Sequence, residues 1–317
     1  MSKLAFITGG AGFLGSQLCN ILLESNFHVI CFGRTLPEKL SNYTRKLIQG
    51  ADYHAVDLKI DLQYVKNIIS QNVNSKYDEL YFFNLAWSGE DGLSDLNVSS
   101  QFMNIIFTQE LYDLSDKLGF DCFIHSGTME EKFAQKYTNL NFQVDNLYNR
   151  HVIYALAKLY SRYSLKLNSK SRTKIVINSN AHLIGPGDKK DSFLQQVIIS
   201  HLENKDVNMS SGEQLFDVIH VLDCAKAYLL TARHGRGIDE FWIGSNAPRQ
   251  LYQYVDDINL LFDRNVIVKR NAIPFNDVIL DYSAFKADKL YCLGFEKSFS
   301  FKQSVSELAQ HLSKRDN

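Results

Sequence analysis

Tyr154 and Lys158 are the side chains in this chain that are best suited to transferring a proton. They stand four residues apart, so in a helix both project from one face. An ammonium close to a phenol favours the phenolate and lowers the pKa of the tyrosine, and the phenol then exchanges a proton readily with a carbonyl or an alcohol. The pair predicts a centre that interconverts those two groups.

The same spacing recurs at Tyr282 and Lys286, so spacing alone does not identify a catalytic pair. That second pair lies in the tail, far from any strand end, and we interpret it as structural. Tyr154 lies in a long helical pattern after a strand that ends in hydroxyls. We expect one hydroxyl to hydrogen-bond the developing oxyanion, with Thr128 as first choice and Ser126 as second, although such residues also commonly serve strand-end turns.

Glycines follow the first expected strand directly and open the first expected helix, in the run from Thr8 to Gly15. Glycine permits the tight turn, and backbone N–H groups at a helix N-terminus bind a pyrophosphate. This context favours a dinucleotide site over a merely flexible turn, and Lys158 would then also hold the nicotinamide ribose. The cofactor contacts expected here are Gly9, Gly12, Phe13, Leu14 and Gly15.

Arg34 stands at the end of the second expected strand, where a NAD-preferring site usually carries an acidic residue that binds the ribose hydroxyls. A guanidinium is suited to gripping a 2′-phosphate. We therefore expect NADP(H), with NAD(H) as the alternative, and with a solvated loop charge as the plain interpretation of Arg34. Four residues at the ends of the third and fourth strands are also expected to line the cofactor: Asp57, Leu58, Leu85 and Ala86.

Short β-rich runs alternate with amphipathic stretches through the first half of the chain. Strands are expected at 4–8, 28–32, 53–56, 80–86, 121–125 and 174–178. Helices are expected from 13 and at 61–71, 94–118 and 147–168. This alternation predicts an α/β fold with a Rossmann-type, doubly wound parallel sheet. A helix at 223–234, a strand at 241–243 and a helix at 301–312 follow.

Loops interrupt this regularity after residue 178. We expect a dinucleotide-binding domain of residues 1–177 plus 223–247, and a smaller C-terminal α/β substrate domain of residues 178–222 plus 248–317. The smaller domain would close over the carboxyl ends of the strands, where ligands of such sheets bind.

Composition is that of an ordinary globular enzyme, with 317 residues, 45% hydrophobic residues and a net charge of −1. No charge imbalance suggests nucleic acid or a membrane surface as partner. The 5 cysteines are scattered, so neither a metal site nor a disulfide framework is expected. No apolar run approaches about 18 residues, and the first residues run straight into a strand, so the expected compartment is the cytoplasm.

With these motifs the chain resembles the extended short-chain dehydrogenase/reductase family of nucleotide-sugar epimerases, dehydratases and 4-ketoreductases. Ile184–Gly187 resembles the family's Tyr-Gly-Pro-Gly loop, Asp217–Asp223 its Asp-Phe-Ile-Tyr/His-Val-x-Asp segment, and Leu293–Phe295 its late Leu-Gly-Trp/Phe. The resemblance covers nearly the whole length. It implies a homodimer, with a four-helix bundle formed by the helices near 94–118 and 147–168.

Departures from the family pattern concern the substrate. Many epimerases carry an arginine that grips the sugar-nucleotide diphosphate at the position of Phe216, so Arg249 and Arg270 are the alternative cations. His182 stands where many members carry asparagine, although a lone histidine is somewhat more often structural than a ligand contact. The residues expected to contact the substrate are Thr128, Tyr154 and His182.

The resembling dehydratases follow the catalytic threonine with an Asp-Glu pair that removes water. Here Met129 takes the aspartate position and leaves Glu130 and Glu131, which argues against dehydration. Arg34 favours a net reductase that consumes NADPH over an enzyme that retains NAD. Three segments, 126–128, 185–188 and 211–214, are most similar to the CDP-abequose synthase-like and related 4-ketoreductases.

We therefore expect NADPH-dependent reduction of the 4-keto group of a dTDP- or CDP-linked 4-dehydro-6-deoxyhexose, in the biosynthesis of deoxysugars for O-antigen-type polysaccharides. The first alternative is a nucleotide-sugar 4-epimerase with bound NAD. The second is a non-catalytic scaffold that senses a dinucleotide, although a sensor would not need the Thr128, Tyr154 and Lys158 set.

Overall fold

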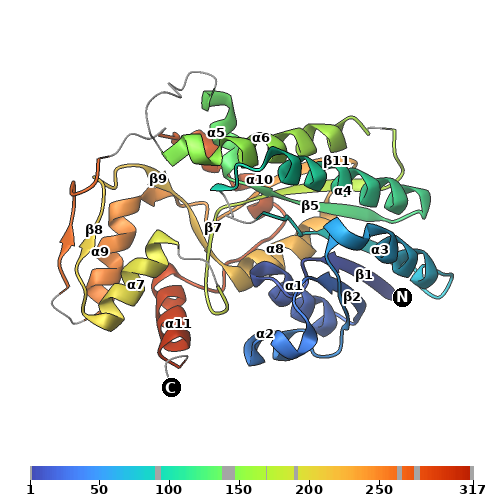
Figure 1. Ribbon diagram of the computed structural model, residues 1–317, viewed down its shortest axis with the longest axis horizontal. Helices are drawn as coiled ribbons and strands as arrows, with labels where there is room; N and C mark the ends of the chain where they lie inside the picture. Colours follow the sequence, from blue (N-terminus) through green and yellow to red (C-terminus); the bar gives the residue numbers. More distant parts are fainter. Residues whose placement is uncertain are drawn as a thin grey trace.

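Seven parallel strands form the central sheet of the protein, described by a computed structural model (Figure 1). In spatial order the strands are β11 (Ile238–Ile243), β6 (Lys174–Asn180), β5 (Cys122–Thr128), β4 (Glu79–Asn84), β1 (Lys3–Thr8), β2 (Phe27–Gly33) and β3 (Asp52–Ala55). Every neighbouring pair runs parallel. The order β3-β2-β1-β4-β5-β6 is that of doubly wound dinucleotide-binding folds. The predicted α/β fold with a Rossmann-type sheet is confirmed.

The structure describes residues 2–89, 94–137, 147–168, 170–188, 192–262, 266–274 and 279–314, and for 135–137 and 147–150 the backbone alone. Its helices are α1 (Phe13–Glu24), α2 (Asn42–Leu47), α3 (Leu58–Asn72), α4 (Val98–Lys117), α5 (Glu130–Tyr137), α6 (Leu147–Lys166), α7 (Phe193–Glu203), α8 (Val221–His234), α9 (Leu251–Leu261), α10 (Asp288–Tyr291) and α11 (Phe301–Ser313). Two short 3-10 helices span Pro37–Lys39 and Tyr282–Phe285.

Apolar residues cover both faces of the sheet because side chains alternate along each strand. In β1, Ala5 and Ile7 pack in one cluster with α1 and α8, whereas Leu4 and Phe6 pack in another with α3, α4 and α6. All four are fully buried. The continuous apolar run at the start of the chain is therefore the consequence of a strand between two helical layers.

A third apolar cluster lies apart from the sheet, among α7, α9 and α11. Figure 1 shows these three helices grouped at one end of the molecule. Three two-stranded sheets accompany them: β7 (His182–Ile184) with β10 (Val218–His220), β9 (Leu215–Phe216) with β12 (Arg249–Gln250), and β8 (Val207–Asn208) with β13 (Val268–Lys269). The domain boundaries given above stay a prediction.

Several element ends differ from the sequence prediction, and β5, for example, continues to Thr128, three residues beyond the expected end. Helix α3 begins at Leu58 rather than residue 61, because the Asp57 carboxylate caps it by accepting a hydrogen bond from Lys59 N at 2.9 Å. The backbone kinks at Asp61, where the apolar periodicity begins. Strand β4 ends at Asn84, two residues before the expected end.

The acidic residues of the segment Asp217–Asp223 connect distant parts of the chain. Asp217, fully buried, accepts hydrogen bonds from Trp242 Nε1 at 2.7 Å and from Ser245 N. Burial raises its pKa above the ordinary value. Asp223, at the start of α8, accepts hydrogen bonds from the backbone N–H groups of residues 298 and 299 at 3.0 Å. Both carboxylates therefore have structural roles, because each holds together segments that are far apart in the chain.

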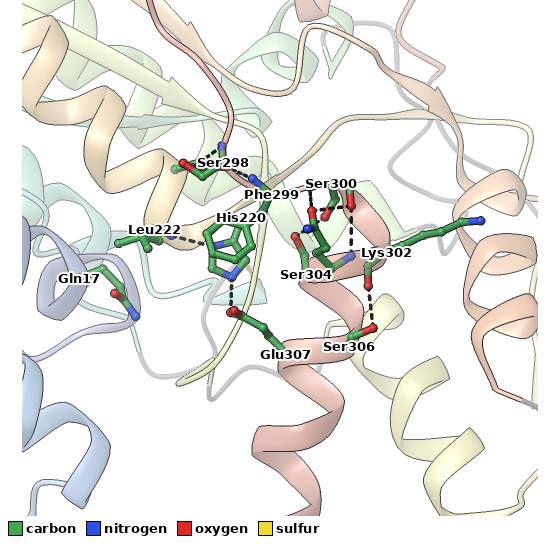
Figure 2. Close-up of polar contacts among 12 residues, drawn as sticks. Gln17, His220, Leu222, Ser298, Phe299, Ser300, Lys302, Ser304, Ser306 and Glu307 are labelled. Carbon is green, nitrogen blue, oxygen red and sulfur yellow. Dashed lines mark hydrogen bonds and ion pairs between the residues drawn. The ribbon is translucent and has the colours of Figure 1, made fainter.

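His220 joins α8 to α11 in the same region, as Figure 2 shows. Its Nδ1 accepts a hydrogen bond from Leu222 N at 3.2 Å, and its ring stacks on Phe299 with centroids 3.9 Å apart. Its Nε2 lies 3.3 Å from the Glu307 carboxylate on α11. Burial lowers the pKa of His220 to about 4, so the ring is neutral at physiological pH.

Candidate active site

Helix α6 and the end of β5 bring Tyr154, Lys158 and Thr128 together. Lys158 Nζ donates a hydrogen bond to the Ser126 carbonyl oxygen at 2.8 Å. A side-chain hydrogen bond joins Thr128 to the Tyr154 phenol. The four-residue spacing of Tyr154 and Lys158 thus aims both side chains at the strand end, because they share one face of the helix.

The pKa of Tyr154 is raised, so the sequence-based expectation of a lowered pKa is wrong. Burial is the main cause, because it disfavours the phenolate, and the negative charges of Glu130 and Glu131 raise the pKa further. The hydrogen bond from Thr128 acts in the opposite direction. Tyr154 is therefore a neutral phenol at physiological pH, which is the form that donates a proton.

Thr128 and Ser126 direct their hydroxyls to different neighbours, because side chains two residues apart share a face of the strand but lie roughly 7 Å apart along it. Ser126 Oγ accepts hydrogen bonds from Tyr228 of α8 at 3.0 Å and from Asn180 Nδ2 at 3.1 Å. Its carbonyl oxygen, by contrast, serves Lys158. Thr128 is the hydroxyl that the structure brings to Tyr154.

Trp87, which the sequence prediction missed, lies against both members of the Tyr154–Lys158 pair. Lys158 Nζ lies 3.9 Å from the centroid of the indole ring. The rings of Trp87 and Tyr154 meet edge to face, with centroids 6.2 Å apart. The available signal was position alone, because Trp87 directly follows Leu85 and Ala86, which the sequence already placed beside the cofactor.

A buried ion pair lies beneath Thr128 and was also missed. Glu131 accepts a hydrogen bond from Thr128 N at 2.7 Å and pairs with Arg162. Arg162 also donates to Ser179 and lies 3.3 Å from Glu240. Arg162 follows Lys158 by four residues, so α6 presents the phenol, the ammonium and the guanidinium on one face.

Gly127 leaves room for this ion-pair network. A Cβ at position 127 would lie 2.8 Å from Glu131 Oε1 and 3.2 Å from Ser179 Oγ, so the ends of both side chains would have to shift. The glycine between Ser126 and Thr128 therefore gives the carboxylate room to reach the backbone.

The glycine turn lies at the end of β1, next to the end of β4. Gly9 has φ +74°, and a Cβ there would lie 3.1 Å from Ala86 N; a Cβ on Gly15 would lie 2.1 Å from Gly9 O. Thr8 Oγ1 accepts hydrogen bonds from the N–H groups of Leu85 and Ala86, each at 3.2 Å. The turn and the segment after β4 are thus held in contact.

The N-terminus of α1 fits the phosphate of a dinucleotide. Gly12 is its N-cap residue and makes no side-chain cap hydrogen bond. Phe13, Leu14 and Gly15 form the first turn. Backbone N–H groups of a first turn have no partner within the helix and point beyond its N-terminus, where the helix dipole favours an anion. Close packing of the glycines therefore leaves the backbone itself as the binding surface.

The other predicted cofactor residues lie along the same edge of the sheet. Arg34 is exposed, directly after β2. Asp57 and Leu58 follow β3, where Val56 N donates to Gly33 O at 2.8 Å. The Asp57 carboxylate also has its capping role in α3.

Besides Thr128 and Tyr154, the residues considered for the substrate are His182, Arg249 and Arg270, and these three are placed differently from one another. The ring of His182 packs against that of Phe216 with centroids 5.2 Å apart, and the backbone N–H of His182 donates to the Asp217 carbonyl oxygen. Arg249 pairs with Asp257 at 2.8 Å and lies over Tyr254, so its charge is engaged within α9. Arg270 is exposed, and its guanidinium donates to the Ser211 carbonyl at 3.0 Å.

Within the described residues no group of three or more His, Cys, Asp or Glu side chains is arranged to hold a metal ion. Four of the cysteines are buried, and Cys292 is exposed. In the part of the chain that the structure describes, no helix combines the length and apolar character needed to cross a membrane.

Comparison with known proteins gives one family match and several distant relatives. The model of the NAD dependent epimerase/dehydratase family matches residues 5–244. CDP-abequose synthase of Salmonella muenchen is 20% identical over 312 residues, which cover 97% of each chain.

Solved structures of similar shape cover nearly the entire chain. UDP-glucose 4-epimerase of Thermotoga maritima, determined with UDP-glucose, has a TM-score of 0.76 at 22% identity and covers 99% of this chain and 100% of its own. dTDP-glucose 4,6-dehydratase of Bacillus anthracis, determined with NAD, has a TM-score of 0.77 at 18% identity, with coverage of 99% and 98%. At such identities the likeness shows the fold.

Proposed function

The chain belongs to the NAD dependent epimerase/dehydratase family, and from that premise we propose that it reduces the 4-keto group of a nucleotide-linked 4-dehydro-6-deoxyhexose with NADPH. The observation that carries the proposal is the meeting of Thr128, Tyr154 and Lys158 at the end of β5. The distant relationship to CDP-abequose synthase supports a nucleotide-sugar substrate. Bound NADPH would supply the hydride for this reduction.

The chain's own residues would supply the proton and stabilise the oxygen. Tyr154, kept neutral by burial, donates its proton to the carbonyl oxygen as that oxygen becomes an alcohol. Thr128 shares the hydrogen bond and stabilises the developing negative charge. The Lys158 ammonium favours the phenolate that remains. The first turn of α1, with Gly9, Gly12, Phe13, Leu14 and Gly15, would hold the dinucleotide phosphates.

Preference for NADP(H) is supported by Arg34. It follows β2 directly and is exposed, and neither of its neighbours in the chain, Gly33 and Thr35, carries a carboxylate. A guanidinium in that place suits a 2′-phosphate, which an acidic residue would repel. Asp57, Leu58, Leu85 and Ala86 complete the proposed cofactor edge, and His182 stays a proposed substrate contact. For the diphosphate, Arg270 is the better candidate, because Arg249 is paired with Asp257.

A homodimer is also proposed, through α4 and α6. These helices pack together and carry large apolar side chains that are exposed at helical spacing. An exposed apolar face of this kind commonly marks a protein interface. Its members are Val98, Phe102 and Ile106 on α4, and Leu156, Tyr160 and Tyr163 on α6.

The test is consumption of NADPH, followed by its absorbance, with dTDP-, CDP- and GDP-4-dehydro-6-deoxyhexose in separate reactions. Loss of absorbance with one of them supports the reductase and names its nucleotide. Tyr154→Phe should then lose at least about a hundredfold in kcat, the contribution typical of general acid catalysis. The matched control is Tyr282→Phe, whose tyrosine has the same spacing to a lysine but is exposed in the tail.

A nucleotide-sugar 4-epimerase is the second candidate, supported by the likeness to the UDP-glucose 4-epimerase of Thermotoga maritima across the whole chain. Such an enzyme regenerates its NAD in each turnover and keeps it bound. NAD released on denaturing the purified protein, together with no consumption of NADPH, would replace the reductase by the epimerase.

A further inference from the structure

Trp87, on the loop after β4, is held in a fixed position beside Tyr154 and Lys158 by hydrogen bonds. Its indole Nε1 donates a hydrogen bond to Gln101 Oε1 at 2.7 Å. Gln101 is fully buried in α4 and donates in turn to Asp95 at 3.1 Å. The ring is therefore fixed by polar groups that have little freedom to move.

The next residue is held in the same way. Ser88 N donates to Asn104 Oδ1 at 2.8 Å, and the Asn104 amide donates back to Ser88 O at 2.7 Å. Gln101 and Asn104 are three residues apart, so they share one face of α4. Two side-chain amides of one helix thus set both the path of the backbone and the plane of the indole.

The fixed ring presents its face to a buried cation. Lys158 is buried, and its Nζ lies 3.9 Å from the indole centroid, well within the distance at which the ring quadrupole attracts an ammonium. The indole carries no net charge, so this contact stabilises the ammonium while leaving its charge to act on neighbouring groups. The same ring contacts Tyr154.

We propose that Trp87 is a positioning residue of the catalytic centre, whose indole face seats the Lys158 ammonium while its ring supports Tyr154. This rests on the proposed function as far as turnover is concerned, but the contact itself is independent of the substrate. Among the described residues, the other titratable groups close to the pair are Arg162 on α6, His125 on β5, and Glu130 and Glu131 on α5, with His151 of α6 lying 3.4 Å from Glu130.

The first experiment tests the contact without turnover. The chain has 2 tryptophans, so in a Trp242→Phe background Trp87 is the only tryptophan, and excitation selective for indole reports on it alone. Lys158→Met removes the ammonium from the ring and should change the intensity or wavelength of the Trp87 emission. Lys226→Met on α8 is the matched control. Emission that responds equally to both substitutions, or to neither, would overturn the proposal whatever the enzyme's substrate is.

The second experiment tests the role, on whichever 4-keto sugar the wild type reduces with NADPH. Trp87→Leu retains apolar bulk but no aromatic face, and kcat should fall roughly tenfold with little change in KM, the size of one desolvated cation–π contact. Because the ring stabilises protonated Lys158, the alkaline limb of the kcat–pH profile should move about one unit toward lower pH.

Trp87→Phe keeps a smaller aromatic face and separates positioning from simple packing. It should restore most of the lost kcat and return the alkaline limb toward its wild-type position. A leucine variant with an unchanged pH profile, or a phenylalanine variant no better than leucine at equal thermal stability, would overturn the proposed role. If the leucine variant does not fold, the Lys158→Met emission still decides the contact.

Discussion

Burial governs the chemistry of the residue that would donate the proton. Burial and the charges of two nearby carboxylates hold the Tyr154 phenol in the neutral form, while Thr128 is the hydrogen-bond partner that makes the phenolate less costly. Lys158 adds a positive charge at the adjacent strand end. Opposing effects therefore act on the pKa of the Tyr154 phenol oxygen.

That balance predicts the result of removing one carboxylate charge. Glu130→Gln should lower the pKa of Tyr154, because a negative charge close to the phenol disfavours the phenolate. The tyrosinate absorbance of Tyr154 is isolated by subtracting the pH titration of Tyr154→Phe from that of its parent. Glu110→Gln on α4, whose carboxylate pairs with Lys66 at the surface, is the control. A titration moved to higher pH, or moved equally by the control, would contradict the assigned cause.

Sequence reasoning finds those residues of the site whose partners are close in sequence or lie at strand ends. Tyr154 and Lys158 share a helical spacing, and Thr128 ends a strand. Trp87 carries no such pattern. Arg162 does follow Lys158 by four residues, but its partners Glu131 and Glu240 lie on other segments of the chain, which spacing alone does not indicate. The raised pKa of Tyr154 was unpredictable for the same reason, since burial is a property of the folded surroundings.

Helix α5 and helix α6 hold the end of β5 in place through charge. Glu131 of α5 contacts the Thr128 backbone and Arg162 of α6, and Arg162 extends the network to Glu240 on β11. Both members of the central pair are largely excluded from solvent, with exposed side-chain fractions of 3% and 11%. Such a pair is costly to break, because a single charge would remain buried.

Arg162→Ala should therefore reduce the free energy of unfolding by about 3–5 kcal/mol, the cost of leaving the Glu131 carboxylate buried without this partner. Urea denaturation at neutral pH measures it. Lys166→Ala, one turn further along α6, removes a more exposed cation from the same Glu240 and should cost less than about 1 kcal/mol. Equal losses in the two variants would show that the burial of the Glu131–Arg162 pair is not what matters.

Long apolar elements were predictable, and the shortest strands were not. The inner strands of the central sheet are largely buried on both faces, so their sequences are nearly continuous apolar runs between helices, whereas the edge strand β3 is partly exposed. Strands β8, β9, β12 and β13 have two residues each, too few for any periodicity, and they exist because distant segments pack beside them. Helix α3 starts early because of a cap, a local effect that apolar spacing does not register.

At the scale of the molecule, the chain separates an end that holds the cofactor turn from a helical end that surrounds its own apolar cluster. Asp223 and His220 connect them through the segment that leads into α11. The outer face of α4 and α6 belongs to neither connection. Its apolar residues lie on the two helices that also carry Gln101, Tyr154 and Lys158. A dimer formed through this face would therefore restrict the movement of the helices that position the site.

Replacing apolar residues of this face by charge should separate the proposed homodimer. A Phe102→Asp, Tyr160→Asp double variant places two carboxylates where a packed interface would exclude water. Burying these unpaired charges costs more free energy than the association of the two faces gains. Light scattering coupled to size exclusion should give the 36.3 kDa chain mass for this variant and twice that mass for the wild type. Leu260→Asp, at an even more exposed apolar position on α9, is the control and should leave the mass unchanged. A wild type that already has the mass of a single chain would overturn the dimer, and a double variant that keeps the doubled mass would place the interface on another face.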